Sequence, residues 1–367
     1  MPAALPATVY HCPDPVLAVG GTWDRLLARS SANTIFLSAG WLRAAWEAFG
    51  EGRRLLVVLL GDPDAPVAGG AFTEQGGVVE FLGTGPSDYL DVVFSSDFEE
   101  SAKPQALCAI LRTAMEATPG FRRFHLKNIP EENGTPACLV ACSGPLWGTI
   151  LRVARAPSME MSAGPEAVKK KSLRRHENGL AKIGQLTCET FSSKEDIEPV
   201  LEPFFQQHVE RWTGTPFPSL FLDERNREFF RRMVRYLGPS GWLRCTTVKL
   251  DGRLLAAHLG SFHAKRFTWY KPTYDPAFAK HSPGEVLLKR LVERAIAEGA
   301  EEFDFTIGDE AFKDRFATKV RAIVDVEVTN RRWRSLRTRA KLRLRHLAKN
   351  FVRSLGPRDL LSRWRKK

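Results

Sequence analysis

The 367-residue sequence predicts an α+β protein of two similar lobes, each a mixed, mainly antiparallel sheet flanked by helices. Three observations support this class. Strand-like runs rich in Val, Leu and Phe alternate with amphipathic segments along most of the chain. The order of helices and strands is similar, though less clear, in the first half. The length exceeds that of one domain of usual size, so two copies of one fold account for it.

The first half begins with a helix at 38–49, because Ser38 is a typical cap and Trp41, Leu42 and Trp46 have helical spacing. Turns of Gly, Pro and Asp then separate apolar runs. The elements expected next are strands at 53–62, 65–75 and 78–94, a helix at about 98–118, a strand at 121–129, an apolar stretch at 147–153 and a linker at 155–165.

The second half has the clearer pattern of an α+β domain. Asp251-Gly252 is a strong hairpin signal between two apolar strands, and Gly299 ends a long amphipathic helix. The elements expected are a basic helix at 164–184, helices at 195–212 and 224–237, strands at 242–252, 253–264 and 265–276, a helix at 283–298, a strand at 301–309, a short helix at 310–316 and a strand near 324–328.

Positive charge is concentrated near the C-terminus. The formal net charge is +12, and residues 331–367 alone hold 15 Lys and Arg and one acid, Asp359. The other residues hold 39 basic and 41 acidic side chains, a net charge of −2. We therefore expect an N-terminal lobe at 1–157, a C-terminal lobe at 158–330 and a basic tail at 331–367.

Apolar residues of this tail recur at steps of three and four. They are Trp333, Leu336, Ala340, Leu344, Leu347, Phe351 and Leu355. The tail is thus predicted to be a basic amphipathic helix. Such a helix binds an anionic membrane surface, packs its apolar stripe on its own protein, or contacts nucleic-acid phosphates. The sequence leaves all three alternatives open.

Several classes are excluded by composition. The longest apolar run, Leu55–Leu60, is too short to cross a bilayer, and the first residues lack the pattern of a secretory signal. Six scattered cysteines fit a reducing compartment. We expect a cytoplasmic protein, located at the inner membrane face if the tail binds lipid. Cys138 and Cys142 lack a second pair of ligands, so no metal is expected.

The C-terminal half resembles a known family. The resemblance is carried by KKSLRRHENGLAKIG, VLEPFFQQHVERW, LDGRLLAAHLGSF and RFTWYKPTYDPAFAKHSPGEVLLKRLVERAIAEGAEEFDFTIGDEAFKDRFAT, in this order. These segments are similar to GNAT-superfamily acyltransferases of the cellulose- and exopolysaccharide-associated type, which are related to Fem-type aminoacyltransferases. The resemblance covers about Val168 to Thr329 and, more weakly, residues 1–150. It implies tandem GNAT-like lobes that transfer an acyl group from a thioester such as acetyl-CoA to an amine or hydroxyl.

The predicted donor site is the start of the helix at 283–298, because a helix N-terminus offers free N–H groups to a pyrophosphate. Ser282 is the expected cap and Pro283 suits the first turn. The candidate donor-binding residues are His281, Ser282, Pro283, Gly284, Glu285 and Lys289. Typical GNAT enzymes carry a Gln/Arg-x-x-Gly-x-Gly/Ala loop here. Because this sequence departs from it, acetyl-CoA, another acyl-CoA and an aminoacyl-tRNA all stay open as donors, and a plain capped helix is the alternative.

Acyl transfer needs a base for the nucleophile, a donor to the carbonyl oxygen and a proton for the leaving thiolate. Asp309 and Asp304, near the end of the FDFTIGD strand, are the carboxylate candidates. Asp309 alternatively caps the next helix and pairs with Lys313. His258 is a candidate base or a core residue, and Tyr270 is a candidate acid or a sheet aromatic.

Four residues are candidates for holding the acceptor. Lys271 and Lys313 would bind an anionic group, and Asp88 and Tyr89 lie in the polar segment GPSDYLDV of the first half. The sequence has no G-x-S-x-G, Walker or G-x-G-x-x-G motif, so covalent serine catalysis and these nucleotide sites are not expected.

The sequence therefore predicts a two-lobed acyltransferase in which the acceptor attacks the donor directly. The expected acceptor is an amino sugar or a lipid-linked sugar of the cell envelope or an exopolysaccharide. One alternative is a Fem-like aminoacyltransferase that binds charged tRNA through the tail and the basic 169–175 segment. The other is a non-catalytic binding protein.

Overall fold

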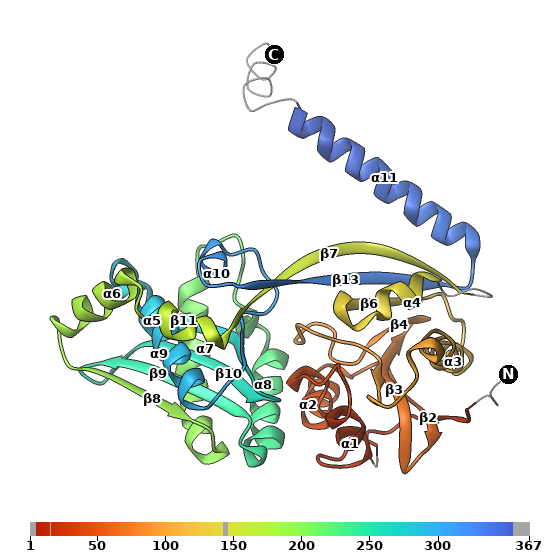
Figure 1. Cartoon of the computed structure of the whole chain (residues 1–367), viewed down its shortest axis with the longest axis horizontal. Coiled ribbons are helices and arrows are strands. Elements are labelled where there is room, and N and C mark those ends of the chain that lie inside the picture. The colour runs from red at the N-terminus through yellow and green to blue at the C-terminus, as the bar shows by residue number, and fades with distance from the viewer. Residues whose placement is uncertain (1–4, 15, 142–145, 355–367) are drawn as a thin grey trace.

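A continuous sheet of 13 strands runs through the computed structural model and carries helices on its faces (Figure 1). The structure describes residues 5–14, 16–141 and 146–354, with side chains to residue 344. The strands are β1 Ala7–Tyr10, β2 Arg54–Asp62, β3 Ala65–Gln75, β4 Val78–Phe81, β5 Val93–Phe94, β6 Arg123–Pro130, β7 Trp147–Glu160, β8 Leu186–Phe191, β9 Leu243–Leu250, β10 Arg253–His263, β11 Arg266–Tyr274, β12 Glu302–Asp304 and β13 Lys319–Thr329. The helices are α1 Thr22–Ala28, α2 Ala39–Phe49, α3 Lys103–Glu116, α4 Thr135–Ala141, α5 Gly164–Val168, α6 Lys171–Ala181, α7 Lys194–Trp212, α8 Glu224–Leu237, α9 Pro283–Ala297, α10 Ala311–Asp314 and α11 Arg332–Ser354.

The same strand plan occurs twice, which confirms the predicted tandem α+β class. In the first half β2, β3 and β4 are antiparallel neighbours, and β6 pairs in parallel with β4. In the second half β9, β10 and β11 are antiparallel, and β12 pairs in parallel with β11. Helices α3 and α9 make the two crossovers, as a parallel connection requires.

The two halves exchange strands. β13 lies between β6 and β7, while the C-terminal end of β7 pairs with β12. β7 and β13 also pair with each other along all of β13. The predicted linker at 155–165 is therefore wrong at its start, because β7 continues to Glu160 with Ala156 and Met159 buried. The predicted lobe boundary at 157/158 stays a prediction, and β7 runs through it.

Other local predictions hold or need correction. Ser38 caps α2, and its hydroxyl accepts the Trp41 N–H at 3.4 Å. Asp251 and Gly252 both have positive φ, as a two-residue hairpin turn requires. The basic helix is broken into α5 and α6, since Lys170 leaves the helical conformation. The strands expected at 78–94 and 301–309 are much shorter, because polar loops interrupt them.

An aromatic core joins the halves. Trp41 of α2 packs edge to face on Phe229 of α8, at 5.1 Å between ring centroids, and on Tyr270 of β11, at 5.2 Å. Phe36 contacts Tyr89 and Tyr270 in the same way. Edge-to-face packing of large buried rings fixes the relative position of the groups that carry them. The loop after β4 is thus held against β11.

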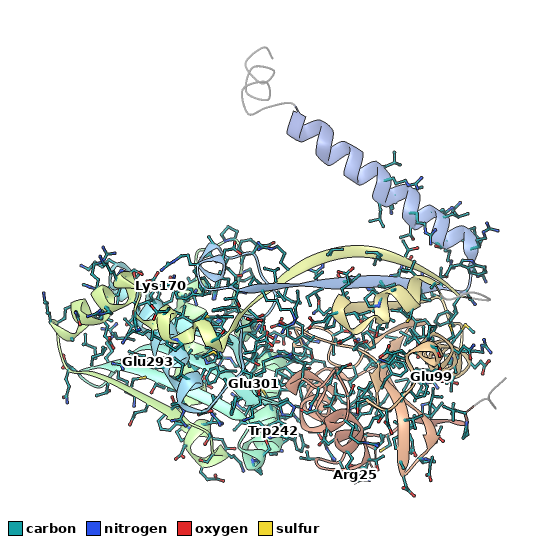
Figure 2. The ribbon with its side chains drawn as sticks, in the orientation of Figure 1. Arg25, Glu99, Lys170, Trp242, Glu293 and Glu301 are labelled. Atoms are coloured by element: carbon teal, nitrogen blue, oxygen red, sulfur yellow. The ribbon has the colours of Figure 1, made fainter. Side chains whose placement is uncertain are left out.

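α11 leaves the body at the end of β13 and projects away from it (Figure 1). Beyond the contacts of its first turns, which include β7 and β13, the helix stands clear of the rest of the molecule (Figure 2). The predicted tail helix is confirmed through Ser354, while the side chains of Leu347 and Phe351, and Leu355 as a whole, lie outside the described part. Within the described residues, every helix is too short or too polar to cross a lipid bilayer.

A buried polar contact also ties the halves together. The Tyr89 hydroxyl donates to Asp304 Oδ1 at 2.7 Å, and both side chains are almost completely buried. The other carboxylate oxygen, Oδ2, lies 3.7 Å from Arg266 Nε and 3.6 Å from Arg321 Nη1. Burial raises the pKa of Asp304, and the two guanidinium groups oppose this shift.

Tyr89→Phe should lower the free energy of unfolding by about 1–3 kcal/mol, because Asp304 loses a buried donor. Urea unfolding measures this change. Tyr10→Phe, at a partly buried tyrosine of β1, is the matched control and should cost less. Equal losses in both variants would show that the Tyr89–Asp304 contact contributes nothing.

Candidate active site

The sheet opens between β11 and β12. These strands pair in parallel only from Arg266–Thr268 to Glu302–Asp304. β11 continues to Tyr274, but the chain after Asp304 turns aside at Thr306, whose φ is 57°. The Thr306 hydroxyl still donates to the Trp269 carbonyl, at 3.3 Å. The register between β10 and β11 also shifts here, with one extra residue in β11 between Thr268 and Lys271.

A cavity of about 640 Å³ occupies this opening, which is the size of a site for a cofactor or small substrate. Its walls come from β11, the start of α9, the segment 306–313, the end of α7 with the loop after it, and one residue of the N-terminal half, Asp88. The cavity contains these predicted site residues: Asp88, Tyr270, Lys271, Ser282, Pro283, Gly284, Glu285 and Lys313.

The start of α9 forms one end of the cavity. Pro283 occupies the first turn and Ser282 the N-cap position, as predicted. Ser282 has a left-handed conformation, however, and its side chain makes no capping hydrogen bond. A Cβ added to Gly284 would meet only Tyr274 Cδ1, at 3.8 Å. The backbone at Gly284 is thus open to a ligand. Glu285 is neutralised by Arg315, at 2.7 Å, and faces His176 Nδ1 at 3.0 Å.

Two predicted donor residues lie outside the cavity lining. The Lys289 ammonium is held by Glu177 at 2.7 Å and Glu293 at 2.8 Å, so it stabilises the contact between α6 and α9. His281 ends the 3-10 helix before α9 and has its ring beside Phe278.

Asp88 is the carboxylate that the N-terminal half brings to the cavity. It is partly buried and lies beside Lys271, Lys313 and the Thr306 hydroxyl. Burial raises the pKa of Asp88, while Lys271, Thr306 and Lys313 act in the opposite direction. A carboxylate with a raised pKa in a cavity is suited to accept a proton from a nucleophile.

The cavity also contains groups that sequence reasoning missed. Arg211 of α7 donates to the Pro272 carbonyl at 3.0 Å and stacks on the Tyr274 ring at 4.3 Å. His208, one turn earlier, is buried and bonded to Ser219 Oγ at 2.8 Å. Burial, with Arg211 and Lys271 nearby, lowers the pKa of His208 to about 4. Arg211 and His208 belong to the segment HVERW of α7. The family resemblance of that segment was the one sequence signal for a role in the site, because its spacing is that of any amphipathic helix.

Lys313 is a buried cation at the cavity wall. Its ammonium donates to the Ile307 carbonyl at 3.0 Å and pairs with Glu310 at 2.9 Å. The predicted Asp309–Lys313 pair is therefore wrong, and Glu310 occupies the capping position of α10 without a side-chain cap. Asp309 itself is exposed and outside the cavity lining.

The positions of Tyr270 and His258 do not fit their predicted roles as catalytic acid and base. The Tyr270 hydroxyl donates to the Pro86 carbonyl at 2.6 Å, so it points to the N-terminal half, and burial raises its pKa well above the ordinary value. His258 is fully buried, and its Nε2 accepts the Tyr270 N–H at 3.1 Å. Burial lowers the pKa of His258 to about 3. His258 is therefore a buried structural residue that holds the backbone of β11 at Tyr270.

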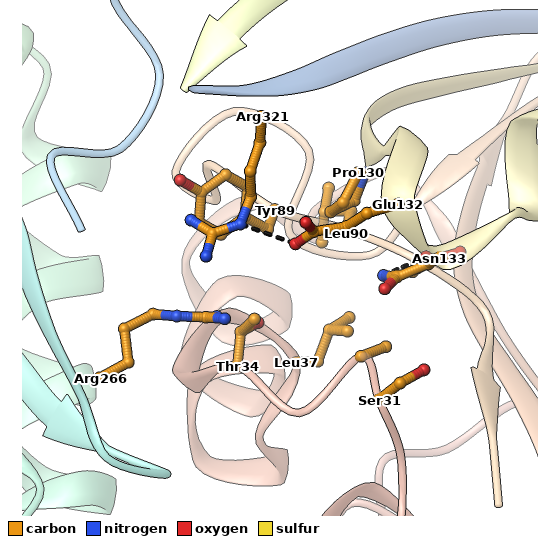
Figure 3. Close-up of a pocket in the computed structure, with 12 residues that line it drawn as sticks. Ser31, Thr34, Leu37, Tyr89, Leu90, Pro130, Glu132, Asn133, Arg266 and Arg321 are labelled. Atoms are coloured by element: carbon orange, nitrogen blue, oxygen red, sulfur yellow. Dashed lines mark hydrogen bonds and ion pairs between the residues drawn. The ribbon is translucent and has the colours of Figure 1, made fainter. Parts of the chain in front are cut away.

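Tyr89 lines a second, much smaller cavity, and Asp304 is its hydrogen-bond partner. This cavity has a volume of about 20 Å³ and is lined by Tyr89, Arg266 and Arg321 among others (Figure 3). The dashed lines in Figure 3 include the hydrogen bond from Arg321 to Glu132, 2.6 Å long. Its volume suits one water molecule, so we assign Tyr89 and Asp304 to the joint between the halves.

These features define a class of protein: two lobes on one plan, with a cavity where two parallel strands separate beside a helix start. Residues 167–314 match the family model of the acetyltransferase (GNAT) domain. Residues 167–314 are therefore a GNAT-type domain, and the chain as a whole has a tandem GNAT-like fold. The narrower likeness to cellulose-associated enzymes stays a prediction. No curated protein sequence matches the chain.

Solved structures agree on the fold. FemX aligns with a TM-score of 0.59 and 13% identity, over 86% of this chain and 96% of that one. The C-terminal domain of a putative lysylphosphatidylglycerol synthetase from Agrobacterium fabrum gives 0.53 and 15%, over 87% and 93%. A tandem GNAT protein of the clavulanic acid pathway gives 0.51 and 10%, over 89% and 99%. At these identities the likeness concerns the fold.

Among the described residues, no group of three or more His, Cys, Asp and Glu is arranged to hold a metal ion. Cys142, one of the two cysteines considered in the sequence, lies outside the described residues.

The position of His258 predicts a pH effect on stability. Its folded pKa of about 3 is below that of an unfolded histidine, about 6.5, so the unfolded chain binds the proton first and stability falls as the pH drops below 6.5. His258→Gln should remove about 2 kcal/mol of the loss between pH 7 and pH 5. Urea unfolding at both pH values tests this, with the exposed His11→Gln as control.

Proposed function

We propose that this protein is an acyl-CoA-dependent N- or O-acyltransferase, with acetyl-CoA as the first donor to test and an amino sugar or lipid-linked sugar of the cell envelope or an exopolysaccharide as acceptor. The observation that carries the proposal is the cavity between the separating strands, into which Asp88 projects from the other half of the chain. The donor enters from the α9 side and the acceptor from the Asp88 side.

The donor end suits a pyrophosphate. In the first turn of α9 Pro283 has no N–H, and the Glu285 N–H donates to the Ser282 carbonyl at 2.9 Å. Gly284 is the position where the backbone is open to a phosphate, because a Cβ added there would meet only Tyr274 Cδ1, at 3.8 Å. The separated edge of β11 beside it offers peptide groups to an extended amide-containing arm such as pantetheine. Positive charge on this side comes from four exposed side chains: Lys169, which lies between α5 and α6, and Lys171, Arg174 and Arg175 of α6.

The transfer step follows from these positions. The acceptor nitrogen or oxygen attacks the thioester carbonyl carbon, the new C–N or C–O bond forms, and the C–S bond breaks. A main-chain N–H group on the separated part of β11 would stabilise the carbonyl oxygen as it gains charge. The Asp88 carboxylate takes the proton of the nucleophile, and the Lys313 and Lys271 ammonium groups lie nearby to neutralise the thiolate and return a proton.

A Fem-like aminoacyltransferase that uses charged tRNA is the second candidate. It is supported by the fold likeness to FemX and by the exposed cations of the 169–175 segment. This segment lies close to the start of α9, since Arg315 bonds to Ser172 in the segment and to Glu285 in α9. The chemistry at the cavity is the same, since an ester carbonyl replaces the thioester. The two candidates differ in the donor that the α9 end binds.

Asp88→Asn should lower kcat/KM about 100-fold or more, because the amide cannot accept the proton, with a smaller change in the KM of the acceptor. The acidic limb of the pH–rate profile should also disappear. Steady-state assays with acetyl-CoA and amino sugars measure both. Asp309→Asn, at an exposed carboxylate outside the cavity lining, should change the rate less than about twofold. An Asp88→Asn variant of full activity would exclude Asp88 as the base.

Gly284→Leu should weaken acyl-CoA binding at least about tenfold, because the new side chain would enter the place proposed for the pyrophosphate. Calorimetric titration with acetyl-CoA and with a dephosphorylated analogue measures the effect. Gly179→Leu is a matched control, because an added Cβ there meets no neighbour within 4 Å and Gly179 lies on α6, outside the cavity lining. Absent acyl-CoA binding together with salt-dependent binding of charged tRNA would favour the second candidate.

A further inference from the structure

The base of α11 is attached to the body through its polar face. Ser335 Oγ and Thr149 Oγ1 are 2.9 Å apart, and Ser335 is 3% exposed. The Thr338 hydroxyl donates to Glu327 at 2.7 Å, and Arg339 donates to the Gly148 carbonyl at 2.9 Å. These partners belong to β7 and β13, so the first three turns of α11 are fixed to the long strand pair.

The apolar stripe of the same helix faces away from the body. Trp333 is 47% exposed, Leu336 54% and Leu344 66%, and Ala340 between them is also exposed. At 3.6 residues per turn these positions lie opposite Ser335, Thr338 and Arg339. A surface helix that packs on its own domain normally has its apolar residues turned to the domain and its polar residues in solvent. Packing on the body, one of the three alternatives for the tail, is therefore ruled out for residues 331–344.

Charge indicates what covers this stripe. Between residues 331 and 344 there are seven Lys and Arg and no Asp or Glu. Arg334 and Arg337 flank the Trp333 ring, at 5.3 and 4.8 Å from its centroid. A second copy of the chain would bring like charges together, and nucleic acid would leave the outward apolar side chains in water. A surface of anionic phospholipid matches both features, since it accepts the apolar side chains between headgroups and attracts the arginines.

We infer that α11 is a rigidly mounted docking helix for an anionic membrane surface. The apolar side chains of Trp333, Leu336 and Leu344 insert at the headgroup level, and the flanking Arg and Lys side chains contact lipid phosphates. The polar attachment to β7 and β13 then fixes how the body is oriented on the membrane. This inference is independent of the reaction at the cavity.

The test is co-sedimentation of the full chain with vesicles of phosphatidylcholine alone and of phosphatidylcholine with phosphatidylglycerol. The chain should bind the anionic vesicles and not the neutral ones, and binding should weaken as salt rises. Trp333→Ser/Leu336→Ser/Leu344→Ser keeps every charge and should lower the partition coefficient at least about tenfold. Leu342→Ser, on the half-buried inner side of the helix, is the matched control and should retain binding.

Two further measurements distinguish loss of lipid insertion from misfolding of the variant and from a purely electrostatic contact. Thermal unfolding of the triple variant should match that of the unchanged chain, because its three side chains are exposed. Tryptophan emission should shift to shorter wavelength on anionic vesicles, and Trp333→Phe should remove most of that shift. Equal binding by the triple variant, or binding of RNA without binding of vesicles, would overturn the inference.

Discussion

The pairing of β7 with β13 is the constraint on which the rest of the molecule depends. Along all of β13 the two strands pair with each other, and each also pairs with a strand of the opposite half. The sheet is thus continuous from β1 to β8, and neither half can rotate without breaking a ladder of backbone hydrogen bonds. This is why a residue of the first half, Asp88, occupies a fixed place in a cavity of the second.

The cavity exists because β11 and β12 begin as a parallel pair and then separate. A sheet normally closes such an edge with further pairing, since unpaired peptide groups in the interior are costly. Here the chain turns aside at Thr306, whose hydroxyl donates to the Trp269 carbonyl just beyond the paired part. The open edge, the uncovered start of α9 and the Asp88 carboxylate therefore face one space, as direct transfer between two substrates requires.

Burial distinguishes residues that support the fold from a residue that can act as a base, although their side chains are chemically similar. His258 and Asp304 have the residue types of a base, but both lie in the interior, where burial holds His258 neutral and Asp304 is bound to Tyr89 and faces two arginines. Asp88 shares the raised pKa of Asp304 but borders the cavity. Access to a substrate, and not residue type, separates the candidate base from the groups that support the fold. The same reasoning applies to α11, where exposure of the apolar face supports the proposed lipid surface.

The sequence by itself determined the elements and their class, because the helix at 38–49, the Asp251-Gly252 hairpin and the start of α9 at Pro283 are set by local periodicity, caps and turns. It also led to the proposed donor end, since Gly284 follows that helix start directly. The tertiary structure alone decided which residues meet. The exchange of β7 and β13, the inward position of Asp304 and the exposed position of Asp309 depend on pairing between segments more than 100 residues apart. No local pattern contains that pairing, because the free energy that fixes it comes from burial between the two halves.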